Sequence, residues 1–501
     1  MNETRLIKLK GLINEINDIN MAAAVLGWDQ ETYMPAGGIN DRADQLSTLS
    51  KISHEKFTSK EIGDLIGELK TEITNINDET DDVRLIKLLD KIYSKSIKVP
   101  SSLVSEMSKA ASLGQQAWAE AKKSSDFSKF KPGLKKIVEL KKEYAKIFLP
   151  YDSIYDPLLD DFEPGLKTAD IKAIFDELKP QQVALIRKIS EKDEIDNSFL
   201  FKEYDETKQW SIGEKAITSF GYDWTRGRQD KSTHPFSTNF GIDDVRITTR
   251  VMKNYLPAAL FGSMHESGHA MYEQGINRSL RRTPLARGAS LAIHESQSRL
   301  WENIVGRSKA FWKYFYRELQ NTFPENLSDV SLETFYKGIN KVKPSLIRVE
   351  ADEATYNLHV MLRLEIEIAL MQGAIHAADL PEIWNSKMED YLGIKPQKDS
   401  DGVLQDIHWS MGAIGYFPTY ALGNLVSAQL WECALRDITD LELQIEKGEF
   451  SMLLNWLRKN IHSHGSKFEP QELVEKVTGS KINPSAYTGY LNKKYSEVYG
   501  L

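Results

Sequence analysis

Two histidines four residues apart constrain the fold of this chain more than any other feature. His265 and His269 flank the run Glu-Ser-Gly. Residues at this spacing lie one above the other on a helix face, so a helix over 258–275 lets both imidazoles reach one metal ion. Pro257 suits the first turn of such a helix, and Gly275 suits its end. The sequence therefore predicts a helix that carries two metal ligands.

Glu266 and Gly268 lie between these histidines and extend the pattern. Two imidazoles, a third ligand from elsewhere and an open position for water form the HExxH arrangement of catalytic zinc sites. The metal polarises the substrate, and the glutamate takes and returns a proton. Gly268 costs a helix about 1 kcal/mol relative to alanine, which favours a site where another segment approaches closely. We expect a metal centre with Glu266 as its general base.

A second helix, expected over 289–305 from its apolar spacing, holds the candidate third ligand. His294 and Glu295 are adjacent there, and adjacent helix positions point about 100° apart, so only one of them faces the metal. Glu295 is the predicted ligand, which gives a His2Glu site like the catalytic zinc sites of thermolysin-type enzymes. His294 is then expected behind the ligands or in the cleft. The alternative is that Glu295 is a solvated helix carboxylate.

Composition limits the partners and the compartment. The chain has 501 residues, 41% of them hydrophobic, a net charge of −8 and a single cysteine, Cys433. An acidic chain disfavours nucleic acid or an anionic membrane as its main partner. One cysteine allows no intrachain disulfide, which fits a reducing compartment. Because the charged N-terminal residues also lack the apolar core of a signal peptide, we expect a soluble, cytoplasmic protein.

Helical periodicity dominates the rest of the chain. It predicts helices over four long stretches: 84–93, 102–122, 133–148 and 169–190. The chain shows no repeat and no linker of biased composition. The economical architecture is therefore mainly α, with one helical domain over 1–501. Within it, an N-terminal part at about 1–200 is expected to pack over a catalytic half at about 201–501.

One stretch departs from helical spacing. Val245, Ile247 and Thr249 alternate, which predicts a short strand with one buried face near 244–250. Such a strand either pairs with an extended peptide substrate by strand addition or braces the fold as a small hairpin. Alternation fits both interpretations equally.

Three further clusters carry chemically useful side chains. His234 lies in a Ser-Thr-His-Pro-Phe loop, and Arg348 and Asp352 are expected four apart on a long helix. Gln405 and His408 lie in a loop before two tyrosines. Taken singly, each cluster has a structural explanation: a solvated loop histidine, an ion pair on one helix face, and a core histidine with satisfied hydrogen bonds.

Together these clusters match one family. The chain resembles the Taq-type thermostable zinc metallocarboxypeptidases, whose motifs HPF, DxRxT, HExxH, HES(G)Q, IRxxAD and GxxQDxHW all occur here in order. The motifs stand at His234–Phe236, Asp244–Thr248, His265–His269, His294–Gln297, Ile347–Asp352 and Gly402–Trp409. Trp28–Pro35 extends the resemblance to the N-terminal part, so it covers essentially the whole chain.

The resemblance implies a mainly helical fold with a deep substrate groove, like that of neurolysin and angiotensin-converting enzyme. It also implies release of single C-terminal amino acids from peptides, dependence on one Zn²⁺ per chain that Co²⁺ can replace, and a homodimer. Peptides with a free C-terminus are the expected substrates.

The resemblance further suggests which side chains act on the scissile bond. Tyr420 is expected to stabilise the oxyanion of the tetrahedral intermediate, and His408 is its expected neighbour. Tyr416 is the competing candidate for that role. His234 is expected to contact the substrate backbone near the scissile bond.

An exopeptidase must also bind a terminal carboxylate. The guanidinium of Arg348 is the candidate, because it offers paired, charge-assisted hydrogen bonds. Gln405 and the turn at Asp399–Asp401 are expected to help close that end of the groove. The alternative is that Arg348 only pairs with Asp352 and braces a helix.

One position departs from the wider habit of HExxH peptidases with a glutamate ligand. Many of them carry an aspartate four residues after that glutamate, where it orients the first histidine, but this chain has Arg299 there. The partner of His265 must therefore come from elsewhere, and the sequence does not identify it.

Other functions compete with a carboxypeptidase. A dipeptidyl carboxypeptidase or an oligo-endopeptidase fits the same groove and the same residue types. A non-catalytic, zinc-stabilised helical scaffold that binds peptides is the rival from another class, although Glu266 beside an open coordination position favours an enzyme. A ferritin-like di-metal bundle requires two Glu-x-x-His pairs, and no such pair of motifs stands out in the sequence.

Overall fold

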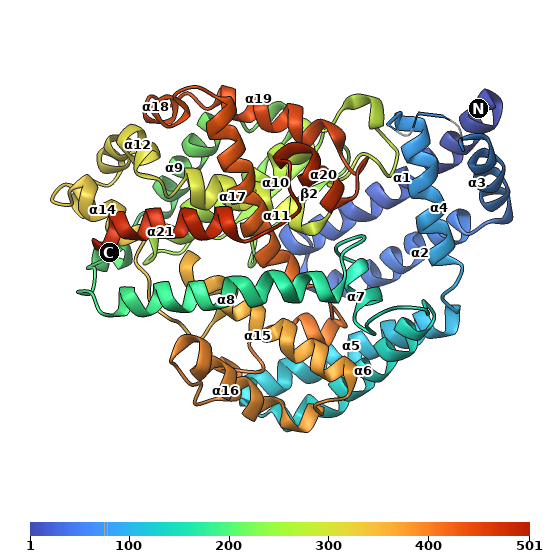
Figure 1. Cartoon of the computed structure of the whole chain (residues 1–501), viewed down its shortest axis with the longest axis horizontal. Helices are drawn as coiled ribbons and strands as arrows, with labels where there is room; N and C mark the ends of the chain where they lie inside the picture. The colour runs from blue at the N-terminus through green and yellow to red at the C-terminus, as the bar shows by residue number, and fades with distance from the viewer. Residues whose placement is uncertain (75, 78) are drawn as a thin grey trace.

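The computed structural model of the chain describes residues 1–74, 76–77 and 79–501, and these fold mainly as α-helices. Figure 1 shows helices from distant parts of the chain side by side, with α8 (Thr168–Ser190) running beneath α21 (Ser485–Tyr499). The predicted mainly α-helical body is confirmed. Within the described ranges, no helix is long and apolar enough to cross a membrane.

The described chain before the sheet is mostly helical. Its helices are α1 (Glu3–Thr32), α2 (Ile39–Phe57), α3 (Lys60–Glu72), α4 (Asp81–Ser96), α5 (Ser101–Ser124), α6 (Lys131–Lys146), α7 (Asp156–Asp160), α8 and α9 (Glu206–Phe220). The four ranges predicted from apolar spacing correspond to α4, α5, α6 and α8, and α6 ends slightly earlier than expected.

The second set of helices surrounds the two that carry the histidine motifs. It comprises α10 (Leu256–Gly275), α11 (Leu291–Arg299), α12 (Lys309–Thr322), α13 (Pro324–Leu327), α14 (Leu332–Ile339), α15 (Glu353–Gln372), α16 (Leu380–Leu392), α17 (Pro418–Asp437), α18 (Leu441–Glu446), α19 (Ser451–Asn460), α20 (Pro470–Thr478) and α21. Cys433 is buried in α17.

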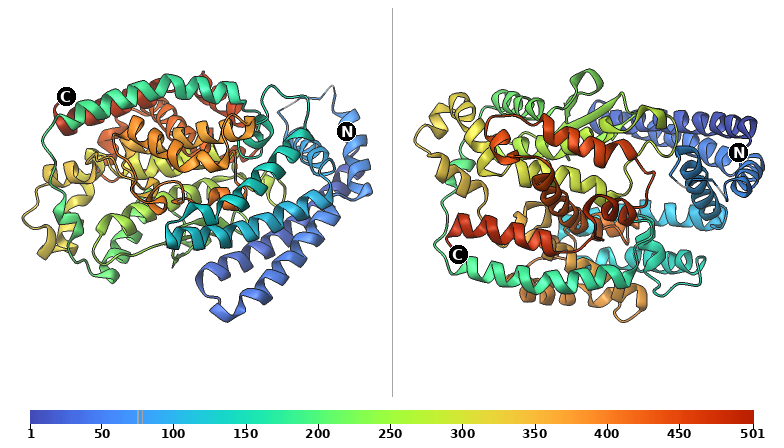
Figure 2. Two further views of the ribbon diagram at one scale, coloured as in Figure 1. Left: turned by 90° about the horizontal axis from the view of Figure 1, so that it is seen from below. Right: turned by 45° about the horizontal axis from the view of Figure 1, so that its top comes forward.

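Two hydrophobic cores hold the helices together. The larger draws its buried residues from Leu103 to Val498. The smaller joins α1, α3 and α4 to buried residues around the loop after α10, including Ile276 and Leu285. Figure 2 shows α1 and α2 running side by side and projecting from the rest of the molecule. The division of the chain at about residue 200 stays a prediction.

A small sheet lies against α10. β3 (Val245–Thr249) is the predicted strand, and Val245 and Ile247 are fully buried on it. It pairs in parallel with β1 (Gln229–Lys231) and antiparallel with β2 (Ser237–Asn239), neither of which was predicted. β3 is the central strand, so both of its edges are already paired. The prediction that a peptide adds to β3 as a further strand is therefore wrong, and β3 braces α10 instead.

α10 and α11 have the expected form, with one local change. α10 has Pro257 in its first turn and ends at Gly275, as the sequence predicts. α11 continues into a π-helical segment, η6 (Leu300–Val305), so the second predicted helix widens at its C-terminal end. Such π segments occur often at functional sites.

Close contact between α10 and α11 depends on Gly268. A Cβ atom at this position would lie 2.6 Å from the carbonyl oxygen of Gln297 and 2.6 Å from the Cα of Ser298. Both atoms belong to the backbone of α11 and cannot rotate away. On the other side of α11, a Cβ at Gly423 of α17 would lie 2.6 Å from the Cβ and Cγ atoms of the Glu295 side chain and 3.2 Å from its backbone carbon. Glycine thus lets three helix backbones meet around one carboxylate.

We predict that Gly268→Ala destabilises the protein by about 1–3 kcal/mol, because the methyl group overpacks a rigid contact. Gly262→Ala in the same helix is the matched control: its Cβ would meet only Thr249 Oγ1, at an ordinary 3.6 Å, so alanine there gains helix propensity. The thermal unfolding midpoints of the two metal-free variants measure the difference. Equal midpoints would contradict the account of the helix contact.

Candidate metal centre

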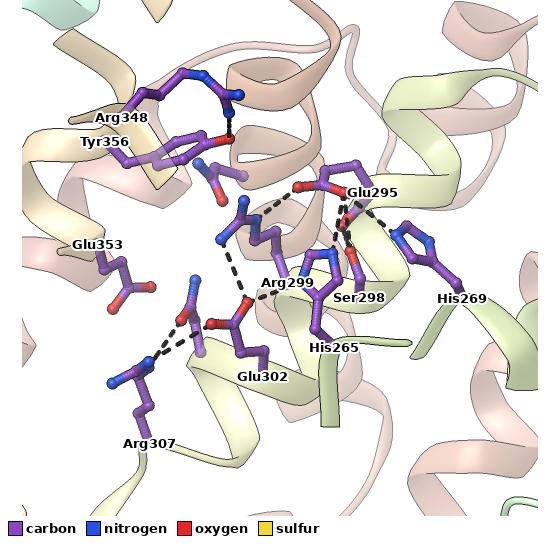
Figure 3. A network of polar contacts seen from close by, with 12 residues as sticks. His265, His269, Glu295, Ser298, Arg299, Glu302, Arg307, Arg348, Glu353 and Tyr356 are labelled. Atoms are coloured by element: carbon purple, nitrogen blue, oxygen red, sulfur yellow. Dashed lines mark hydrogen bonds and ion pairs between the residues drawn. The ribbon is translucent and has the colours of Figure 1, made fainter. Parts of the chain in front are cut away.

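α10 presents two imidazoles to one carboxylate of α11 (Figure 3). The Nε2 atoms of His265 and His269 lie 3.6 and 3.4 Å from Oε2 of Glu295. Within the described ranges, these three side chains form the group of histidine, cysteine and acidic residues whose ligand atoms converge enough to hold one ion. The predicted helix face therefore brings the predicted ligands together.

The separations between the carboxylate oxygen and each imidazole nitrogen fit a tetrahedral metal ion. Nitrogen and oxygen ligands lie about 2.0–2.2 Å from zinc, so two ligands of a tetrahedral site are separated by about 3.3 Å. The measured separations of 3.4 and 3.6 Å are close to this value. Two imidazoles and one carboxylate leave a fourth position open, as in catalytic rather than structural zinc sites.

Both histidines are oriented from behind through Nδ1. Glu302 contacts Nδ1 of His265 at 2.9 Å, and the carbonyl oxygen of His294 lies 3.0 Å from Nδ1 of His269. Each Nε2 is thereby left to face Glu295. Glu302 is therefore the partner of His265 that the sequence did not identify, because the usual aspartate position holds Arg299. A signal existed, because Glu302 follows Glu295 by two helical turns and so lies on a similar face.

Arg299 neutralises the carboxylates of this cluster. Its Nε donates to Oε1 of Glu295 at 2.7 Å, and its Nη1 lies 3.3 Å from Glu302. Arg307 lies 3.5 Å from the other oxygen of Glu302 (Figure 3). The position that holds aspartate in related peptidases therefore holds a cation here, and it fixes the second oxygen of the candidate ligand.

The surrounding charges shift the pKa values of the three candidate ligands. Burial disfavours the imidazolium of His265, but Glu295 and Glu302 outweigh it and raise its pKa to about 9. Burial lowers the pKa of His269 to about 4. Burial also opposes the charge of Glu295, yet Arg299 and the histidines hold its pKa well below the usual range. Binding of a cation must release the proton on His265.

Glu266 lies beside the ligands without a partner of its own. It is 6% exposed, and no described residue forms a hydrogen bond with its carboxylate. Burial, with a smaller contribution from Glu295, raises its pKa to about 7. A general base must be able to accept a proton, and a buried carboxylate with no hydrogen-bond partner in the described part of the chain can do so.

Arg348 does not lie on a long helix, contrary to the sequence prediction. It lies in a short 3-10 segment, η7 (Arg348–Glu350), and α15 begins afterwards with Asp352 as its N-cap. The carboxylate of Asp352 accepts backbone N–H groups of α15, so it is not the ion-pair partner of Arg348. Arg348 and Asp352 are four residues apart, but Asp352 is the N-cap of α15, so Arg348 lies before the helix and not on it.

The partner of Arg348 is Asp406, from the GxxQDxHW motif. Asp406 accepts Nη2–H of Arg348 at 2.9 Å and pairs with Arg363 through its other oxygen. Burial opposes its charge, but the two guanidiniums hold its pKa below the usual range. Tyr356 accepts a further hydrogen bond from Arg348 at 2.8 Å. Arg348 is 5% exposed.

Gln405 is buried in the structure, whereas His234 is exposed. Gln405 is buried against the backbone: it accepts Arg348 N–H at 2.8 Å and donates to carbonyls of Leu346 and Asp401. It therefore fixes the segment that carries Arg348. His234 lies exposed in the loop between β1 and β2, and no described contact joins its imidazole to the metal ligands.

His408, Tyr416 and Tyr420 form one aromatic cluster at the start of α17. Nε2 of His408 lies 3.3 Å from the hydroxyl of Tyr420, and burial lowers the pKa of His408 to about 4. Tyr420 stands one turn before Gly423, the residue in contact with Glu295. The guanidinium of Arg348 lies 4.8 Å from the Tyr420 ring. Tyr416 packs at an angle against both rings, but the hydrogen bond to His408 comes from Tyr420.

The chain is similar over almost its whole length to known carboxypeptidases. A family model described as "Carboxypeptidase Taq (M32) metallopeptidase" matches residues 8–495. Thermostable carboxypeptidase 1 of Thermus thermophilus is 40% identical over 487 residues, which cover 95% of each chain. Carboxypeptidase 1 of Bacillus subtilis is 39% identical over 489 residues, or 97% of each chain. The structure of the M32 carboxypeptidase from Deinococcus radiodurans R1 matches with a TM-score of 0.97 and 37% identity, and the match covers both chains completely.

We predict that Glu295→Ala lowers metal affinity far more than His294→Ala, because only Glu295 directs its side chain to the two Nε2 atoms. Zinc retained after dialysis against a weak chelator is the measurement. A greater loss from His294→Ala would move the third ligand to the neighbouring position.

Proposed function

We propose that this chain, which belongs to the Taq carboxypeptidase (M32) family of metallopeptidases, removes single amino acids from the C-termini of peptides at its centre on α10 and α11. The chain is an enzyme, a metallocarboxypeptidase. The observation that carries the proposal is the convergence of two imidazole nitrogens and one carboxylate oxygen beside the buried Glu266.

Zn²⁺ is the proposed resident ion, with His265, His269 and Glu295 as its ligands. The donor set supports this choice, since two imidazoles and a carboxylate suit zinc and their spacing suits tetrahedral geometry. Co²⁺ is the expected substitute. When bound, the ion supplies Lewis-acid polarisation of the scissile carbonyl and lowers the pKa of a water molecule.

Glu266 is the proposed general base and then the general acid. It takes a proton from the attacking water and returns it to the leaving amine. Burial raises the pKa of Glu266, so this carboxyl group holds a proton more readily than an exposed glutamate does.

Tyr420 is the proposed donor to the oxyanion, with His408 as its neighbour. The hydrogen bond between their side chains favours Tyr420 over Tyr416. Burial raises the pKa of the Tyr420 hydroxyl, so this group stays protonated and able to donate. A donor of this kind contributes about 2.7–4 kcal/mol to stabilisation of the transition state.

Arg348 is the proposed anchor for the terminal carboxylate of the substrate. Asp406 is the one carboxylate that the described ion pairs give to both Arg348 and Arg363. A single carboxylate cannot neutralise two guanidiniums, so this buried cluster keeps a positive charge that an incoming carboxylate offsets. A guanidinium has five N–H donors. Asp406 takes two of them and Tyr356 takes one, which leaves two for the substrate.

Two other residues have lesser proposed roles. Gln405 acts through the backbone of Arg348, which it holds at 2.8 Å, and the turn at Asp399–Asp401 supports the same segment. His234 is proposed to contact the substrate backbone from its exposed loop.

Further features inferred from the sequence stay predictions. They are the homodimer, the cytoplasmic location, the absence of nucleic-acid and membrane partners, the deep substrate groove, and the packing of an N-terminal part over a catalytic half within one domain.

We predict that Glu266→Gln keeps the metal ion but lowers turnover by roughly 10²–10⁴-fold, because an amide cannot accept the proton. The measurements are zinc content by mass spectrometry and hydrolysis of an N-blocked dipeptide. Near-normal turnover with zinc still bound would exclude Glu266 as the base. Loss of zinc from the variant would instead mean that Glu266 supports metal binding by the three ligands.

We predict that Arg348→Ala lowers kcat/KM on peptides with a free C-terminus by a factor worth a few kcal/mol, because a buried carboxylate loses its paired donors. The same variant should narrow the advantage of these peptides over C-terminally amidated ones. Arg348→Lys is the matched variant, since it keeps the charge but not the paired geometry. Unchanged discrimination between acid and amide, in a folded and zinc-loaded variant, would assign Arg348 to structure alone.

A further inference from the structure

A second carboxylate stands behind the candidate ligand His269. Nδ1 of His269 lies 2.7 Å from Nδ1 of His294, and Nε2 of His294 lies 2.8 Å from Oε1 of Glu273. Glu273 stands one helical turn after His269 on α10, whereas His294 comes from α11. The three side chains therefore form a line that leads away from the ligand nitrogen.

The positions of the protons in this line follow from the ligand. If Nε2 of His269 binds a cation, its Nδ1 must carry the proton. The short contact between the two Nδ1 atoms is then a hydrogen bond in which His269 donates and His294 accepts. Since His294 is unprotonated on Nδ1, its neutral ring carries the proton on Nε2 and donates it to Glu273. Each step leaves one donor facing one acceptor.

We propose that Glu273 and His294 together position His269 for metal binding, as Glu302 does for His265. This inference rests on the metal centre proposed above. Glu273 and His294 are positioning residues, because neither belongs to the group of side chains that converges on the candidate metal position. The two ligand histidines thus each have a carboxylate behind them, one directly and one through a second imidazole.

Burial argues that Glu273 is not there to stabilise the fold. It is 5% exposed, and its Oε2 has no hydrogen-bond partner among the described residues. A buried carboxylate with an unsatisfied oxygen is a cost to folding rather than a gain. Its one described polar contact leads to His294. The arrangement is therefore best explained by what it does for the ligand.

Packing fixes the ring of His294 in this orientation. A Cβ atom at Gly288 would lie 2.7 Å from Cδ2 of His294, and the ring of Tyr272 lies 5.2 Å away on centroid distance. A ring held by its neighbours can orient a ligand without paying side-chain entropy at the moment of binding.

The backbone provides a competing explanation that an experiment can separate. The carbonyl oxygen of His294 lies 3.0 Å from the same Nδ1 of His269, so the proton is shared between two acceptors. If the carbonyl alone orients His269, replacing the side chains of His294 and Glu273 leaves metal affinity unchanged. If the side chains contribute, both replacements weaken binding.

The experiment measures the dissociation constant for Zn²⁺ of the full chain by competition with a chromophoric chelator. Wild type is compared with Glu273→Gln, His294→Ala and His294→Asn. Glu163→Gln is the matched control, because Glu163 is equally buried and accepts a backbone N–H of α11 at Ala292 but contacts no ligand imidazole. The thermal unfolding midpoint of each metal-free protein is recorded alongside.

We expect His294→Ala and Glu273→Gln to weaken zinc binding by about 10–100-fold, the smaller loss coming from Glu273→Gln, whose amide oxygen can still accept. His294→Asn should recover part of the affinity, because its Oδ1 can replace Nδ1 as acceptor. Glu163→Gln should bind zinc like wild type. Metal-free Glu273→Gln should unfold at the wild-type temperature or above it, since a buried charge has been removed.

Wild-type zinc affinity in both His294→Ala and Glu273→Gln would overturn the inference and leave the carbonyl as the orienting group. Failure of His294→Asn to improve on His294→Ala would overturn the hydrogen-bond assignment. Failure of the wild-type chain to bind zinc at all would contradict the proposed metal centre itself, so the two proposals fail in distinguishable ways.

Discussion

The close approach of α10 and α11 determines where every other part of the site lies. At Gly268 the two backbones are so near that a Cβ atom would meet main-chain atoms at 2.6 Å. Gly423 allows α17 to approach Glu295 equally closely from the other side. This packing places the carboxylate of α11 opposite the two imidazoles of α10. It also places Tyr420 on α17, one turn before Gly423. A side chain larger than hydrogen at either glycine would separate the ligands.

Charge is arranged in two buried clusters that meet at one tyrosine. Around the ligands, Arg299 offsets Glu295 and Glu302, which would otherwise repel each other. Around the proposed anchor, Asp406 is shared between two arginines. Tyr356 connects the clusters, because the guanidinium of Arg299 lies 4.5 Å from its ring and its hydroxyl accepts from Arg348 (Figure 3). The distance from the candidate metal ligands to the proposed anchor Arg348 is thus fixed by packed, paired groups.

The sequence predicts local geometry well and distant partners poorly. The spacing of the histidines predicts α10, and the 100° rule predicts that only one of His294 and Glu295 faces the metal, because both depend only on helix periodicity. The choice of Glu295 comes instead from the His2Glu ligand set of catalytic zinc sites. Arg348 was placed on a helix because Asp352 stands four residues later, but that aspartate caps the helix instead. The pairing of Arg348 with Asp406 joins segments far apart in the chain, which periodicity cannot reveal. Helix spacing places Glu302 on a face similar to that of Glu295, but only the folded structure shows that Glu302 contacts His265.

In the proposed function, one metal centre removes single residues from a free C-terminus. The most direct measurement is mass spectrometry of the products from one N-blocked tetrapeptide, incubated with the enzyme before chelation, after chelation and after zinc is restored. We expect a ladder of peptides, each shorter by one residue, together with free amino acids. Chelation should abolish the ladder, and zinc should restore it. Release of dipeptides, internal cleavage, or a ladder that persists without metal would contradict it.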